Sequence, residues 1–289
     1  MYVSIRDATI LHAGYPSIKA GLAALDLSAI EADFTREVTL PSITDPKAPF
    51  PVKTDTEVDA YAKHLKENGV KISAFLLANN LNAADLDAEH AWMERAVRVA
   101  HRLGVPAVRI DSAMSGQQEL PFEERVAKFV AGIKRLIDAT EDAPVDLGIE
   151  NHGYQGNDPN FLHGVFDGVG SPRLGMTLDT GNFYWRGHPM SKTLKTIEEF
   201  AKLAKHTHVK NINYPEETRD QQREMGWEYG RYVSPIYEGD IDHKKVVGFL
   251  RAAGYDRDLC IEDESLGKFS EAERKDILMK DAEHLKSLI

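Results

Sequence analysis

The chain carries a single cysteine, Cys260, among its 289 residues. One thiol excludes an internal disulfide framework and a cysteine-rich zinc module, and it fits a reducing compartment. A domain of this size buries roughly three quarters of its unfolded surface, so it needs neither kind of cross-link to remain folded. We therefore expect Cys260 to be a small core filler without a nucleophilic role.

Long apolar runs are also missing from the sequence. The longest ones, such as residues 74–78, fall far short of the roughly 20 residues that span a bilayer. The first residues include the charged Arg6 and Asp7, where a secretory signal would need an unbroken apolar core. These absences predict a soluble, cytoplasmic protein that has no membrane partner.

Positive charge is scarce as well, because the formal net charge is −11 at pH 7. Non-specific binding to nucleic acid requires a basic footprint, which this composition does not provide overall. Only a local basic groove would allow the protein to bind nucleic acid in spite of this net charge. We therefore expect a small-molecule partner and no nucleic acid.

What the sequence does contain is a regular alternation of short β-type runs and longer helical patterns. Strands are expected within residues 2–11 and at 28–34, 71–78, 107–111, 145–151, 174–180, 206–212 and 258–263. Helices are expected at 16–25, 55–69, 87–103, 121–140, 158–168, 190–204, 242–253 and from 270 to near the end. A doubly wound open sheet also alternates in this way, but eight repeats in one undivided chain favour closure. We predict a single (β/α)8 TIM-barrel domain over residues 1–289.

Two connections in this pattern are long. Residues 35–54 hold four prolines and should form a loop. Residues 213–241 contain Trp227, several tyrosines and many charges, and a connection of that length in a compact barrel is usually functional. It would emerge on the C-terminal face of the barrel, where active sites are built. It could equally form an interface in a homodimer or tetramer, which is the oligomeric state that we expect.

Four successive strands end in side chains that bind metals: Glu150, Asp179, His208 and Glu262. The first three lie 29 positions apart (179 − 150 and 208 − 179), about one strand-helix-strand unit. The two-residue period of a strand turns all four toward the barrel axis. Three carboxylates so close together would repel unless they were protonated or bound to a cation. The alternative is a buried ion-pair network, but few Lys or Arg residues are expected to point inward.

The resulting ligand set of two Glu, one Asp and one His is hard, with mixed oxygen and nitrogen donors. It suits Mn²⁺ best, then Mg²⁺ or Co²⁺, and it also accepts Zn²⁺ or Fe²⁺. Four protein ligands leave one or two positions for substrate oxygens, as a catalytic site requires.

Five motifs in order resemble one known family: residues 149–152 (Ile-Glu-Asn-His), 178–182 (Leu-Asp-Thr-Gly-Asn), 206–210 (His-Thr-His-Val-Lys), 238–242 (Glu-Gly-Asp-Ile-Asp) and 261–262 (Ile-Glu). The chain resembles the xylose-isomerase-like TIM barrels, which are sugar and sugar-phosphate isomerases and epimerases related to D-tagatose 3-epimerase and inosose dehydratase. The resemblance implies one divalent metal ion held by Glu150, Asp179, His208 and Glu262. It also implies that Glu150 and Glu262 flank a carbohydrate substrate and act as an acid/base pair.

In that chemistry one Glu removes a proton beside a carbonyl and an enediolate forms. Return of the proton from the opposite face gives an epimer, whereas the use of one face gives an aldose-ketose isomer. Three alternatives remain open at this point: a lyase that dehydrates an inosose or a dehydroshikimate-like acid, a DNA-repair endonuclease of the same superfamily, and a non-catalytic sugar-binding barrel.

Five further residues are candidate substrate contacts: His152, Asn182, Lys210, Glu31 and His12. Asn182 stands where the tagatose epimerase type carries a histidine that contacts substrate. Lys210 either meets a substrate carboxylate or phosphate or extends to the rim of the barrel. Glu31 either bonds sugar hydroxyls or pairs with Arg109. His152 could instead bond a loop carbonyl, and His12 is expected in the loop after the first strand.

Overall fold

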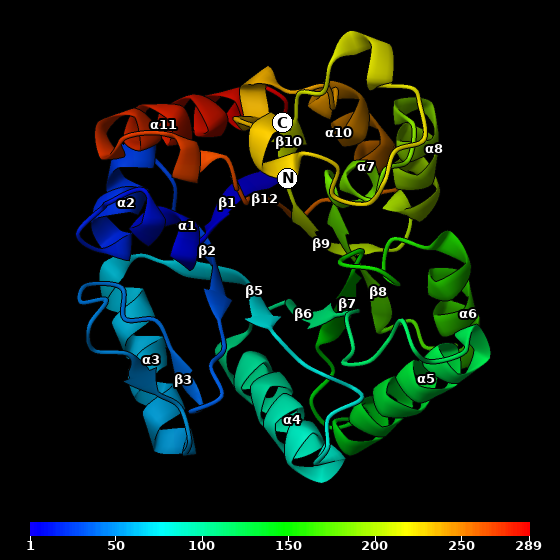
Figure 1. Cartoon of the computed structure of the whole chain (residues 1–289). Helices are drawn as coiled ribbons and strands as arrows, with labels where there is room; N and C mark the ends of the chain where they lie inside the picture. The colour runs from blue at the N-terminus through cyan, green and yellow to red at the C-terminus, as the bar shows by residue number, and fades with distance from the viewer.

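The computed structural model describes residues 1–289 and contains a nearly closed barrel of eight parallel strands (Figure 1). In spatial order the strands are β12 (Asp258–Ile261), β1 (Tyr2–Arg6), β2 (Ala29–Asp33), β5 (Lys71–Leu77), β6 (Ala107–Asp111), β7 (Asp146–Glu150), β8 (Leu174–Asp179) and β9 (Ala204–His208). Just beyond β9, Val209 forms a parallel bridge with Ile261, and its N–H donates to the Cys260 carbonyl at 2.8 Å. This bridge joins the two end strands, and the predicted (β/α)8 TIM barrel is confirmed.

Helices surround the strands on the outside (Figure 1). They are α1 (Asp7–His12), α2 (Ile18–Leu25), α3 (Asp55–Asn68), α4 (Leu86–Leu103), α5 (Phe122–Ala139), α6 (Pro159–Val169), α7 (Asn182–Trp185), α8 (Met190–Ala201), α9 (Tyr229–Tyr232), α10 (His243–Ala252) and α11 (Glu271–Lys286). Local signals set their limits: α3 begins with a capping box between Thr54 and Glu57 and ends at Gly69, whose φ is 67°. No helix combines the length and the apolar character that a membrane crossing requires.

Strand phase divides the barrel as the sequence predicts. Leu147 and Ile149 of β7 and Leu178 of β8 are fully buried members of the apolar core that separates strands from helices. Glu150 and Asp179 lie on the opposite face of the same strands, and both are buried. Because successive side chains of a strand alternate, an apolar outer face requires these polar groups to point along the barrel interior.

Three local assignments from the sequence were wrong. His12 lies at the end of α1 and not in a loop, because Asp7 starts a helix directly after β1 and accepts a bond from the Ala8 N–H at 2.7 Å. The segment 35–54 contains a short antiparallel pair, β3 (Thr39–Leu40) with β4 (Phe50–Pro51). The strand expected to reach residue 212 ends at His208, and residues 211–212 form β10, which pairs with β11 (Val233–Ser234).

The segment 213–241 is not a plain loop but a folded excursion with η1 (Glu216–Thr218), α9, β11 and η2 (Ile236–Glu238). Its aromatic side chains pack on one another, since the Tyr214 ring lies 5.7 Å from Trp227 and 5.4 Å from Tyr232. The Asn211 side chain secures both ends, because it donates to the carbonyl of Ile236 and accepts the N–H of Ile241. The aromatic residues of this segment are therefore partly engaged in holding its own fold.

We expect His243, the first residue of α10, to make the fold sensitive to acid. Burial, reinforced by the neighbouring His284, lowers the pKa of His243 to about 4. Between about pH 6.5 and pH 4 the unfolded chain binds a proton at His243 and the folded chain does not. The contribution of neutral His243 to the free energy of unfolding is therefore fully present above about pH 6.5 and falls as the pH drops toward 4. The loss should reach about 3 kcal/mol at pH 4. Urea unfolding at pH 7 and pH 4 measures it, and His243→Gln should remove this part of the difference; an unchanged difference would contradict the assignment.

Candidate metal centre

Four strand ends bring Glu150, Asp179, His208 and Glu262 together. One ligand atom from each lies within 4.8 Å of those of the others, and all four residues are buried. Strand register explains the convergence: Asp179 of β8 pairs directly with His208 of β9, and the bridge from Val209 to Ile261 sets Glu262 at the same level. Asn151 then ties β7 to β8, since its amide donates to the Asp179 carbonyl at 2.9 Å and accepts the Asp179 N–H at 2.8 Å.

Three of these four side chains have a buried polar atom without a hydrogen bond: Asp179 Oδ2, His208 Nδ1 and Glu262 Oε2. The other oxygen of Asp179 accepts the N–H groups of Gly181 and Asn182 at 2.8 and 2.7 Å, which leaves Oδ2 directed into the cluster. His208 Nδ1 lies 3.3 Å from both Glu150 Oε1 and Glu262 Oε2. Buried atoms of this kind normally find a partner. Converging carboxylate oxygens and one imidazole nitrogen fit a divalent cation.

The expectation of few inward cations was wrong, because Arg6, Arg109 and Lys210 all reach the cluster. Arg109 forms a charged hydrogen bond with Glu150, and Arg6 forms one with Glu262. The Lys210 ammonium lies 3.0 Å from Glu262 and 3.2 Å from Asp179. The three cations face seven carboxylates in total: Glu31, Asp33, Asp111, Glu150, Asp179, Glu262 and Glu264. The carboxylates around the cluster therefore outnumber the lysine and arginine side chains that reach it.

The three ligand carboxylates differ in acidity. Burial favours the neutral form of Glu150, but Arg109 and His208 outweigh burial and hold its pKa well below the usual value. His208, Lys210 and Arg6 likewise outweigh burial at Glu262 and lower its pKa. At Asp179 burial prevails over Lys210 and raises the pKa to about 8. A divalent ion would displace the proton from Asp179, as it does from protein ligands generally.

Three of the predicted substrate contacts lie around the cluster. Asn182 is buried at the start of α7, and its amide donates to Glu150 Oε1 at 3.1 Å. Lys210 is buried, and its ammonium donates to Glu264 at 2.8 Å. His152 lies further out, with its side chain 45% exposed and Nδ1 3.0 Å from Asp111. Asn182 and Lys210 thus contact the ligand carboxylates directly, whereas His152 stands apart from them.

Of the other two predicted contacts, Glu31 touches the candidate ligand His208 from deeper in the barrel, and His12 lies at the end of α1. Glu31 is fully buried on β2, and its carboxylate accepts from Nε2 of both His206 and His208 at 2.9 Å. Both oxygens are engaged, so none is free for a sugar hydroxyl, and the alternative pair with Arg109 does not form. His12 ends α1, where its carbonyl accepts from Arg274. Cys260 is a buried free thiol, as expected of a core filler.

Sequence reasoning missed Arg6, Glu264 and Tyr229 at this site. Arg6 is the last residue of β1, in the same strand phase as the inward Ser4, so a sharper limit for that strand would have identified it. The Tyr229 hydroxyl, from α9 in the segment 213–241, donates to Glu264, which in turn accepts from Lys210. No local sequence pattern predicts the contact between Tyr229 and Glu264, because it depends on how the segment 213–241 folds back onto the barrel.

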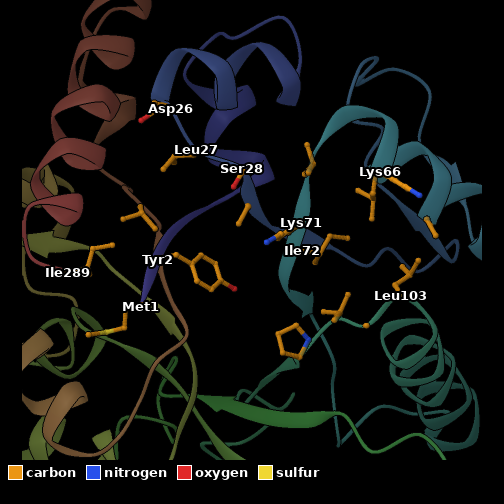
Figure 2. A pocket seen from close by; sticks show the side chains of 18 of the residues that line it. Met1, Tyr2, Asp26, Leu27, Ser28, Lys66, Lys71, Ile72, Leu103 and Ile289 are labelled. Carbon is orange, nitrogen blue, oxygen red and sulfur yellow. The ribbon is translucent and has the colours of Figure 1, made fainter.

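A cavity of about 740 Å³ lies at the opposite end of the barrel, where β1, β2 and β5 begin (Figure 2). Its lining is mainly apolar, with Tyr2, Leu65 and Leu103 among the side chains, and Lys66 and Lys71 at its edge. None of the ligand residues lines it. Its size therefore gives no reason to move the candidate site away from the strand ends.

Fold and strand ends together define an α/β barrel with a candidate metal centre on its C-terminal face. The sequence model of the xylose isomerase-like TIM barrel family matches residues 22–288. The chain belongs to that family. No curated protein sequence matches the chain.

Solved structures with the same fold include the IolI protein with a bound zinc atom, at 18% identity and a TM-score of 0.70, covering 97% of this chain and 96% of that one. The probable 3-DHS dehydratase AsbF from Bacillus anthracis is similar at 16% identity and a TM-score of 0.70, with 99% of each chain covered. A D-tagatose 3-epimerase-like protein gives 16% identity and a TM-score of 0.65, again with 99% of each chain covered. Relationships this distant establish a shared fold, and function has to be argued from the site.

Proposed function

We propose that this protein is a divalent-metal-dependent sugar isomerase or epimerase that moves a proton through an enediolate. The observation that carries the proposal is the convergence of buried atoms of Asp179, His208 and Glu262 beside Glu150, none of which has a hydrogen bond, although Lys210 forms ion pairs with the two carboxylate oxygens. Membership of the family and the likeness to a D-tagatose 3-epimerase-like protein support the same reading.

Glu150, Asp179, His208 and Glu262 would hold the ion. When bound, it would polarise a substrate carbonyl and the adjacent hydroxyl, which acidifies the C–H bond between them. The bound zinc atom of the similar IolI structure supports a divalent ion at such a site. The donor set accepts Mn²⁺, our first choice, as well as Mg²⁺, Co²⁺, Zn²⁺ or Fe²⁺.

Glu150 and Glu262 would transfer the proton. Neighbouring cations keep both ionised, which is the form that a general base needs at neutral pH. They come from non-adjacent strands, β7 and the end of β12, and both lie 3.3 Å from His208 Nδ1. Inversion of a substrate carbon would require one of the two carboxylates to be ionised, as the base on one face, and the other to have taken up a proton, which it would deliver as the acid on the opposite face. Lys210 and Asn182 are the groups best placed to bind substrate oxygens.

Incorporation of deuterium from D₂O tests the proposal. Metal-loaded protein should exchange the C–H beside the carbonyl of at least one member of a panel of ketoses and keto-sugars, followed by NMR or mass spectrometry. The chelated protein is the matched control and should show no exchange, with activity returning when metal is added back. If no metal-loaded sample exchanges with any substrate, the proposal fails.

A dehydratase is the second candidate, because proton removal is shared and the site also offers anion-binding groups. Arg6, Arg109 and Lys210 reach the cluster and could receive a substrate carboxylate, as the likeness to a 3-DHS dehydratase suggests. A dehydratase would expel a β-hydroxyl after the proton is removed. An enone absorbance band that appears on addition of substrate would decide for it.

A further inference from the structure

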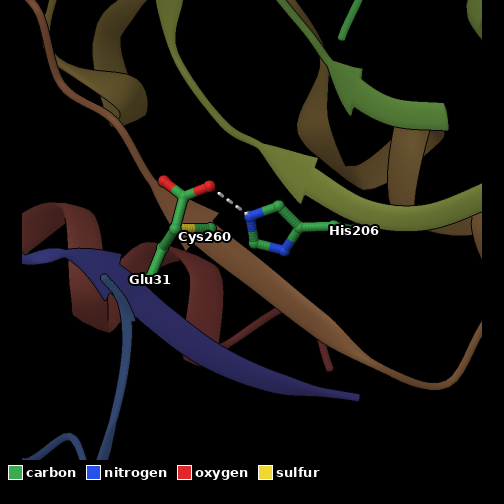
Figure 3. Close-up of side chains that lie close together, drawn as sticks. All are labelled: Glu31, His206 and Cys260. Atoms are coloured by element: carbon green, nitrogen blue, oxygen red, sulfur yellow. Dashed lines mark hydrogen bonds and ion pairs between the residues drawn. The ribbon is translucent and has the colours of Figure 1, made fainter. Parts of the chain in front are cut away.

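Below the candidate metal centre, buried polar side chains continue the site into the barrel. Asp258 Oδ2 lies 2.8 Å from Nδ1 of His206, whose Nε2 lies 2.9 Å from Glu31 Oε1. Glu31 in turn contacts His208 Nε2 at 2.9 Å. Figure 3 shows the middle of this chain, where Glu31 and His206 meet beside Cys260. All these side chains are buried, so water does not compete for the contacts.

The chemistry of these contacts fixes where the protons lie. An ionised carboxylate only accepts, so Nε2 of His206 and Nε2 of His208 must each carry a hydrogen that points to Glu31. In neutral His208 the remaining lone pair is then on Nδ1, the atom that faces Glu150 and Glu262. Only that tautomer can bind a metal ion at the cluster. The Arg6 guanidinium, 3.4 Å from Glu31, and His206 compensate the buried negative charge.

We propose that Glu31 is a positioning residue that fixes the ring and the tautomer of His208 for metal binding, and that His206 and Asp258 hold Glu31 in place. The inference rests on the metal centre of the proposed function and adds a residue that acts through His208. Carboxylates that receive the second N–H of a metal-bound histidine make the ligand more basic and orient it.

A second ion among Glu31, His206 and Cys260 is the competing interpretation, because their ligand atoms also lie within 4.8 Å of one another. The hydrogen-bond distance between Glu31 and His206 argues against it, since a proton already joins these two atoms. The set therefore serves the first ion and does not hold one of its own.

Metal affinity tests the proposal without any need for turnover. Mn²⁺ and Zn²⁺ affinities are measured by competition with a chromophoric chelator for the wild type, Glu31→Gln and the control Glu89→Gln. Glu31→Gln keeps the shape but removes the charge, and it should weaken binding roughly 10- to 100-fold. Glu89→Gln makes the same change at a buried glutamate that pairs with Arg36 and contacts none of these side chains, so it should leave the affinity unchanged. Equal affinity of the wild type and Glu31→Gln would overturn the proposal.

A measurement on the unaltered protein covers the case in which Glu31→Gln does not fold. Two-bond ¹⁵N–¹H correlation of the Zn²⁺-loaded wild type should show His208 protonated at Nε2 and bare at Nδ1; a proton on Nδ1 would overturn the assignment. The two proposals can fail separately. If metal affinity depends on Glu31 as expected but no substrate exchanges deuterium, the proposed enzyme activity is refuted and the positioning role stands. If substrate exchanges deuterium but Glu31→Gln binds metal as tightly as the wild type, the positioning role is refuted and the proposed activity stands.

Discussion

Replacement of Glu150 by glutamine should remove turnover far more completely than it removes substrate binding. The amide keeps nearly the same shape and can still accept from Arg109, which now donates to the Glu150 carboxylate. It cannot take up a proton, however, and loss of a general base costs about 10²- to 10⁴-fold in rate. We expect kcat to fall by at least that factor while the dissociation constant of substrate, measured at saturating metal, changes much less.

Glu262→Gln should behave in the same way, because the two carboxylates share the proton transfer. The matched control is Glu89→Gln, because Glu89 is a buried glutamate of α4 that pairs with Arg36 and with none of the four candidate ligands. Its kcat should stay within a few-fold of the wild type. Parallel loss of binding and turnover in both site variants would reduce Glu150 and Glu262 to metal ligands.

The sequence was sufficient to predict the barrel and the convergence of its ligands, since both depend on repeating local signals. Alternation over eight units predicts closure, and the two-residue period predicts which side chains enter the barrel. Asp179 and His208 pair directly in the parallel register, whereas Glu150 pairs with Thr177, two residues before Asp179, and still reaches the cluster. The structure shows that these residues lie close together, whereas their role as metal ligands stays a prediction.

The charged partners of the ligands could not be predicted in this way. Arg109 of β6 can extend toward strands on either side, and the sequence left its partner open. In the barrel β7 is its direct neighbour, with Asp111 opposite Glu150, whereas β5 separates it from Glu31 on β2. The guanidinium therefore pairs with the nearer carboxylate. Glu31 is left to the histidines of β9, which lie across the barrel and far along the chain.

The contacts of the segment 213–241 could not be predicted from the sequence pattern either. Its length predicts a functional element, but the contact of Tyr229 with Glu264 joins residues 35 positions apart, and Tyr214 packs on Trp227 and Tyr232 further along the segment. Such packing is set by the folded whole and leaves no periodic signal. Whether this segment also forms a subunit interface stays a prediction.

Replacement of Lys210 by methionine should make the fold dependent on metal. The Lys210 ammonium is buried between Asp179 and Glu262, close to the same oxygen atoms that converge on the candidate metal site. Removal of one partner from a buried ion pair costs about 3–5 kcal/mol, because the remaining charges lose their compensation. In metal-free protein we expect a loss of that size in the free energy of unfolding, measured with urea. Mn²⁺ should restore most of it, because the ion supplies the missing positive charge.

Lys205→Met is the matched control, since Lys205 pairs with Asp146 at 3.3 Å at the other end of β9 and is partly exposed. Its loss should be below about 1 kcal/mol and indifferent to metal, as for exposed ion pairs generally. A purely structural ion-pair network predicts a different result for Lys210→Met, namely the same loss with and without Mn²⁺. Because both outcomes begin with a destabilised variant, the decisive quantity is the recovery on adding the ion. Recovery requires the ligand atoms to bind a cation once Lys210 no longer competes for them.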